Sequence, residues 1–229
     1  MIFSVFLCGG FYMERHFFYK VKKLRVKDIT TMGIMLALYL VLNVMIGYSF
    51  GGLYFTINIQ FIPIFIMAIY TDWLRTLIVA MIGSIIAFFL PANLDAGNIP
   101  AYLFDYAIPL WTIAFCSLFM PREIKNIVKY SSFYDKRIGK IWGSIKYSFI
   151  WIWRQKGFVI GIFVFVVLFF ISKSIGGVLF WRGDKPINFQ LFIWAGGVNL
   201  PNSIIDSILL GILIPLVCNI LQPIKKQIY

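Results

Sequence analysis

The chain has 229 residues, of which 61% are hydrophobic and 13% are charged, and its mean hydropathy is +0.86. This composition excludes a water-soluble globular domain and indicates an integral membrane protein. The formal charge of +12 does not indicate a nucleic-acid partner, because the basic residues lie between apolar segments. The three cysteines are scattered and His16 is the sole histidine, so we expect no disulfide framework, metal site or cofactor.

Residues 1–28 are expected to form a basic segment on the cytoplasmic side of the membrane. The first part, Met1–Tyr12, is apolar but too short to span a bilayer. It also lacks the basic start and the small-residue cleavage site of a signal peptide. Met13 is an alternative start, and the sequence leaves that choice open.

Residues 29–229 are predicted to form an all-α domain of six transmembrane helices, since a helix needs ~20 apolar residues to cross a bilayer. Pro201 suits the first position of the last helix, where its missing N–H group costs nothing. The six predicted spans are Ile29–Gly47, Thr56–Tyr70, Leu74–Leu90, Ala101–Met120, Gly157–Leu179 and Pro201–Leu221.

The orientation of these spans follows from the lysines and arginines. All but three of the 21 fall on one side of the arrangement, the exceptions being Lys173, Arg182 and Lys185. Basic residues are retained on the cytoplasmic side, so both termini are predicted to be cytoplasmic. The positive charge also favours contact with anionic membrane lipids. The predicted external segments are Tyr48–Phe55, Pro91–Pro100 and Phe180–Leu200.

Residues 121–156 form a long, basic and aromatic-rich insert between the fourth and fifth spans. Trp142, Trp151 and Trp153 alternate with basic residues, as in a helix that lies at the lipid headgroups. A docking surface for a cytoplasmic partner is the alternative interpretation of this insert.

Three ionisable residues fall within or at the rim of the apolar segments, all toward the external side: Asp105, Lys173 and Asp206. Such residues are costly in a membrane and usually face a cavity or a partner, which makes them candidates for a binding site. Each also has an ordinary explanation. The two acids lie near helix starts, where the helix dipole favours them, and the lysine can extend to the headgroups.

Aromatic residues gather at the predicted external boundary, namely Tyr54, Tyr106, Trp181 and Trp194. Aromatic belts occur there in membrane proteins of many kinds. The segment Phe180–Leu200 adds two glycines and Asn199 to its tryptophans. This mixture predicts a lid that stacks on a planar ring.

The motifs of nucleotide-binding loops, zinc proteases and serine hydrolases are absent from the chain. We therefore expect no catalytic residues and no ATPase site. Gly33 and Ala37 give the first span a small-xxx-small spacing, which permits close approach of another helix, either within the bundle or from a partner.

Four motifs together resemble the S components of energy-coupling factor (ECF) vitamin transporters, most of all the thiamine-specific type. They are Ile175-Gly176-Gly177-Val178-Leu179-Phe180-Trp181, Leu103-Phe104-Asp105-Tyr106, Ile62-Pro63-Ile64, and Trp194 followed five residues later by Asn199. The resemblance covers about Thr30 to Lys226, apart from the insert.

This resemblance implies a vitamin-binding subunit of an importer in the bacterial plasma membrane. It implies two partners, a transmembrane T component that contacts Gly33 and Ala37, and a pair of cytoplasmic ATPases. The ligand-binding positions that it implies are Tyr54, Asp105, Tyr106, Lys173, Trp181, Trp194 and Asn199.

Lys173 departs from the family pattern, which has a histidine at this position in thiamine binders. A lysine beside the fixed positive charge of thiamine would repel it, by about 4 kcal/mol at ~4 Å and an effective dielectric of 20. Lys173 therefore pairs with Asp105 or Asp206, extends to the headgroups, or serves another ligand. The open alternatives are an S component for folate, riboflavin or a pyridoxine-like vitamin, a lipid-modifying membrane enzyme, and an assembly subunit without ligand.

Overall fold

A computed structural model describes residues 24–46, 58–90, 98–119, 150, 156–184 and 186–228, with side chains in the last helix described as far as Val217. No strand occurs in these residues. The elements are α1 (Val26–Ile46), η1 (Ile59–Phe61), α2 (Ile62–Tyr70), α3 (Trp73–Phe88), α4 (Ile99–Tyr102), η2 (Leu103–Ala107), α5 (Ile108–Cys116), α8 (Lys156–Phe180) and α9 (Phe189–Ile228). Tyr54, most of residues 1–28 and nearly all of the insert at 121–156 lie outside the described residues.

Helices occupy all six segments that were predicted to span the membrane, but not with equal length. Four are long and apolar enough to cross a bilayer, at Val26–Met45, Ile99–Cys116, Gly157–Phe180 and Phe189–Val217. The other two, Ile59–Tyr70 and Trp73–Phe88, are apolar but shorter than 18 residues. The protein is thus an all-helical, multi-pass membrane protein, in which the described residues supply four candidate spans.

The short helix α2 lies at the centre of the bundle. Every residue from Phe61 to Ile69 is buried, as expected of a helix that is apolar on all sides. Pro63 occupies its first turn, where no intrahelical hydrogen bond is lost. Phe65 meets Phe165 of α8 edge-on, with ring centroids 4.9 Å apart. Such contacts fix α2 against the longer helices and form the main apolar core.

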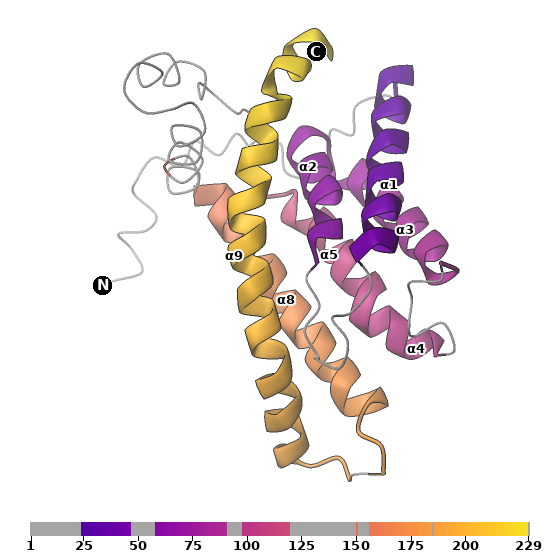
Figure 1. The fold of residues 1–229 in the computed structure, drawn as a ribbon, viewed down its shortest axis with the longest axis vertical. Coiled ribbons are helices and arrows are strands. Elements are labelled where there is room, and N and C mark those ends of the chain that lie inside the picture. Colours follow the sequence, from indigo (N-terminus) through magenta and orange to yellow (C-terminus); the bar gives the residue numbers. More distant parts are fainter. Residues whose placement is uncertain are drawn as a thin grey trace.

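The two longest helices, α8 and α9, form an antiparallel pair joined by residues 181–188 (Figure 1). The sequence predicted a helix start at Pro201, whereas α9 begins at Phe189, so this prediction was wrong by three turns. Asn188 explains the earlier start, because its Oδ1 accepts the N–H of Leu191 at 2.9 Å and caps the helix. Most of the predicted external loop Phe180–Leu200 is therefore helical.

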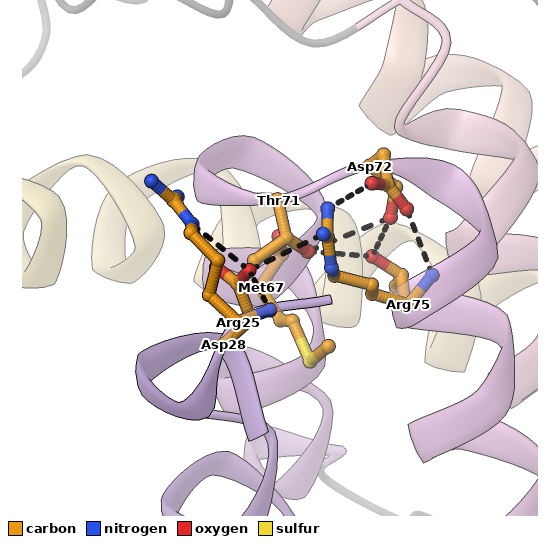
Figure 2. Close-up of polar contacts among 7 residues, drawn as sticks. Arg25, Asp28, Met67, Thr71, Asp72 and Arg75 are labelled. Atoms are coloured by element: carbon orange, nitrogen blue, oxygen red, sulfur yellow. Dashed lines mark hydrogen bonds and ion pairs between the residues drawn. The ribbon is translucent and has the colours of Figure 1, made fainter. Parts of the chain in front are cut away.

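A charged cluster joins α1 to the turn between α2 and α3 (Figure 2). The guanidinium of Arg75 contacts both Asp72 and Asp28, the latter at 3.3 Å, and all three side chains are buried. Asp72 also caps α3, since its Oδ1 accepts the N–H of Arg75 at 2.9 Å. Arg25 approaches Asp28 from the surface, with Nε 3.3 Å from Oδ2. This cluster ties the start of α1, otherwise largely exposed, to the rest of the bundle.

Candidate ligand-binding site

The buried face of α9 changes from apolar to polar along its length. Leu210 and Ile214 are buried in the main core, whereas the preceding turns bury polar side chains. The buried ones are Asn202, Ser203 and Asp206, and the half-buried Asn199 shares their face, since all four positions follow helical spacing. Polar side chains inside a membrane bundle are costly and mark a candidate functional site. The site therefore lies in the half of α9 nearer the 181–188 connection.

The facing side of α8 makes the same change. Phe158, Phe165 and Phe169 are fully buried in the apolar core. One turn beyond Phe169 come Ser172 and Lys173, both buried. Two helices that bury polar groups at the same level support one shared site rather than isolated polar side chains.

Asp105 reaches this region from a π-helical turn, η2, between α4 and α5. Such turns are rare and often occur at functional sites, since they redirect side chains within a helix. The indole Nε1–H of Trp181 donates to Asp105 Oδ2 at 2.9 Å. Two of the predicted ligand-binding residues, 76 positions apart in the sequence, are thus in direct contact. Trp181 is 51% exposed, so this pair lies at the rim of the bundle.

The adjacent glycines of α8 explain how two polar residues approach this helix so closely. A Cβ at Gly176 would lie 2.7 Å from Asp105 Oδ1, which is closer than real side chains come. At Gly177 a Cβ would lie 3.7 Å from Asn199 Nδ2, an ordinary contact. Gly176 is therefore required for the position of Asp105, and Gly177 marks the neighbouring face of α8 that meets Asn199.

Lys173 precedes this glycine pair by about one turn of α8 and is only 8% exposed. Its Nζ is 4.9 Å from the ring centroid of Phe169 and 5.9 Å from that of Tyr106, within the range of cation–π attraction. The ammonium also interacts electrostatically with Asp105 and with Asp206. The expectation that Lys173 extends to the headgroups does not fit this burial, whereas pairing with the carboxylates does.

Asp206 connects α9 to the residue that precedes η1. Its Oδ1 accepts the backbone N–H of Asn58 at 3.0 Å, and its Oδ2 accepts the Asn58 side-chain N–H at 2.5 Å. Gln60 Nε2 in turn donates to Asn58 Oδ1 at 3.0 Å. The sequence drew attention to Asp206 but not to its partners, because nothing in the local pattern links positions 148 residues apart.

The remaining predicted residues are placed differently. Asn199 donates its Nδ2–H to Ala195 O, one turn earlier on α9, at 3.0 Å. Trp194 is 40% exposed on α9, and Tyr106 stacks on Tyr102 with ring centroids 5.5 Å apart. The structure thus brings Asp105, Trp181, Tyr106 and Lys173 together, whereas Asn199 lies on α9 near Gly177 and Trp194 is exposed on the same helix.

Gly33 and Ala37 lie far along the chain from this site, on an exposed face of α1. A Cβ at Gly33 would meet no atom within 4 Å. These two residues therefore do not pack inside the bundle in the described part of the chain. Among the described residues, no group of three or more His, Cys, Asp or Glu side chains could hold a metal ion.

Comparison with known families shows which family the chain belongs to. A family model described as Thiamine transporter protein (Thia_YuaJ) matches residues 29–226, which is most of the chain. The chain belongs to this family of thiamine transporters. The comparison with curated proteins gives no match.

Membership of the thiamine transporter family confirms the resemblance drawn from the four motifs. It makes the protein a membrane transport protein for thiamine uptake. The matched range begins near the start of α1 and ends within α9, so it includes the Asp105–Trp181 contact and the polar face of α9. Sequence reasoning missed Asn58, Asn202 and Ser203 as members of this polar group.

Proposed function

We propose that this thiamine transporter is the substrate-binding S component of an ECF importer in the bacterial plasma membrane. In this proposal it captures thiamine from the outside, with both termini on the cytoplasmic side. A T component and two ATPases then drive delivery, since the sequence contains no nucleotide-binding motif.

The observation that carries the proposal is the Asp105 carboxylate, held by Trp181 beside Tyr106 in a thiamine transporter family member. A carboxylate next to flat aromatic rings suits a cationic ligand with two aromatic rings, because charge and stacking are both satisfied. In the proposal Asp105 and Asn199 bind the polar edges of thiamine, and Tyr54, Tyr106, Trp181 and Trp194 contact its rings.

The exposed face of α1 supports the part of the proposal that concerns partners. Gly33 and Ala37 leave the helix backbone open to another helix in a membrane, where close backbone approach stabilises association. We propose that the T component packs on this face. The insert at 121–156 is proposed to lie on the cytoplasmic side, at the lipid surface or against the same partners.

Two measurements test the proposal separately. Titration of the purified chain with labelled thiamine is expected to give saturable binding at or below micromolar concentration. The absence of binding there would contradict the ligand. Co-expression with a T component and its ATPases is expected to give thiamine uptake that requires ATP, and uptake by the chain alone would contradict the partners. A panel of thiamine monophosphate, riboflavin, folate and pyridoxine serves as the control for specificity.

A further inference from the structure

Asp206 accepts hydrogen bonds from neutral donors, which do not cancel the charge of an ionised carboxylate. The residue is 2% exposed, and the donors described above all belong to Asn58, an amide side chain and a backbone N–H. Neutral donors satisfy the lone pairs of a carboxylate and hold it in one place, but they leave its net charge in the bundle. The charge is therefore available to another group at the same level of α8 and α9.

Lys173 supplies the matching charge. It is buried on α8, the helix that packs against α9, and it interacts electrostatically with Asp206 as well as with Asp105. The rings of Phe169 and Tyr106 add a weaker attraction for its ammonium. A buried cation inside a membrane bundle requires such partners, because hydrocarbon cannot solvate it.

The formal charges of the three ionisable residues sum to −1, from two carboxylates and one ammonium. The two carboxylates are not equivalent in their surroundings. Asp206 is enclosed by α9 and the start of η1, whereas Asp105 lies at the rim, in contact with the half-exposed Trp181. Asp105 is therefore the more accessible of the two carboxylates.

We propose that Asp206, held by Asn58, neutralises Lys173 and so leaves Asp105 to pair with the fixed positive charge of the ligand. Asp206 is then a specificity-determining residue that acts through Lys173 and does not itself touch the ligand. The inference rests on the proposed thiamine-binding function. It explains how a chain with a lysine in the site takes a cationic vitamin.

The charge balance gives a specific test with three variants, Asp206→Asn, Lys173→Gln and the double variant. Each substitution keeps the size of the side chain close to the original, and their formal site charges are 0, −2 and −1. Thiamine affinity is measured alongside that of a neutral analogue, in which carbon replaces the quaternary nitrogen of the thiazolium ring. Thermal unfolding in detergent shows whether each variant is folded.

We expect Asp206→Asn to weaken thiamine binding by about tenfold or more and the double variant to restore it to near the wild-type value. Lys173→Gln is expected to bind thiamine more tightly than the double variant does. Affinity for the neutral analogue is expected to stay within about threefold in all three, since a charge effect requires a charged ligand.

Three results would overturn the inference. The first is an unchanged thiamine affinity of Asp206→Asn. The second is an equal loss of affinity for thiamine and for the neutral analogue, which would indicate a purely structural role. The third result applies if Asp206→Asn does not fold: it is an equal thiamine affinity of Lys173→Gln and the double variant. A wild-type protein that binds no thiamine would instead contradict the proposed function, so the two failures are distinguishable.

Discussion

The described residues hold two groups of charge within the bundle, and they are satisfied in opposite ways. At the junction of α1, α2 and α3, Asp28 and Asp72 both contact the guanidinium of Arg75 (Figure 2). Between η2, α8 and α9, the carboxylates of Asp105 and Asp206 accept hydrogen bonds from neutral donors. The difference teaches that charge alone does not identify a site. In the first group the acids are paired with a buried arginine, whereas in the second the Asp105 carboxylate remains accessible at the rim of the bundle.

The largest effect on stability is expected in the first group, where Arg75 contacts Asp28 and Asp72. Arg75→Met removes the cation that Asp28 and Asp72 share and leaves two buried carboxylates without it. The expected loss is about 3 kcal/mol in the free energy of unfolding. Unfolding by heat or denaturant in detergent measures it. Arg25→Met is the matched control, because that side chain is 48% exposed and an exposed pair contributes at most about 1 kcal/mol. Equal effects of the two variants would contradict the central role of the buried Arg75 in this group.

The largest effect on binding is expected at the rim of the second group. Asp105→Asn removes the acceptor charge that the proposal assigns to the ligand, and a hydrogen bond to a charged group contributes about 1.5–3 kcal/mol. Thiamine affinity is therefore expected to fall by about 10- to 100-fold. Isothermal titration measures it, and Asp184→Asn, an exposed acid in the 181–188 connection, is the control. Wild-type affinity in Asp105→Asn would place the ligand elsewhere.

Gly176→Ala tests the same carboxylate without changing any charge. The new methyl group would lie 2.7 Å from Asp105 Oδ1, so the carboxylate must move away from its position. We expect thiamine affinity to fall by about tenfold, because the displaced carboxylate would form a weaker hydrogen bond to the ligand. Gly197→Ala on α9 is the control, since a Cβ there meets nothing within 4 Å and alanine favours a helix by about 1 kcal/mol. Equal affinities of the two variants would show that the position of Asp105 is not critical.

The smallest effect is expected from Trp181→Phe, which keeps a ring but removes the N–H that donates to Asp105. A single neutral donor contributes about 0.5–1.5 kcal/mol, so thiamine affinity should fall by a few-fold and by no more than about tenfold. Trp111→Phe is the matched control, because its indole donates to Ser84 at 3.1 Å and belongs to the packing between α3 and α5. Stability, and not affinity, is expected to change in that control. A loss of affinity in Trp111→Phe, with a loss of stability alone in Trp181→Phe, would contradict the roles assigned to the two tryptophans.

How far the sequence predicted the fold depends on the element. Composition and the lengths of the apolar segments were enough to predict an all-helical membrane protein with helices in six segments. The start of α9 was predicted at Pro201 because a proline often begins a helix. The cap at Asn188 and the packing of Leu191 and Ala195 on Val178 carry the helix through two glycines instead. In such cases tertiary packing outweighs the local tendency of glycine to interrupt a helix.

The candidate site shows the same division. Asp105 and Trp181 could be predicted, because their motifs resemble those of a family that the match over residues 29–226 confirms. The contacts of Arg75 with Asp28 and of Asn58 with Asp206 could not, since they join residues 47 and 148 positions apart. No short motif records such a pairing.

The sequence by itself determined the membrane environment and the helical class and indicated the family, because hydropathy, charge placement and local motifs are properties of short stretches of chain. Only the tertiary structure decided the use of each buried charge. Burial and the choice of partner depend on which helices meet, and the chain must fold before Lys173 faces two carboxylates or Arg75 faces Asp28. The sequence thus marks an ionisable residue in an apolar segment as a candidate for function, and the contacts between helices show which group it pairs with.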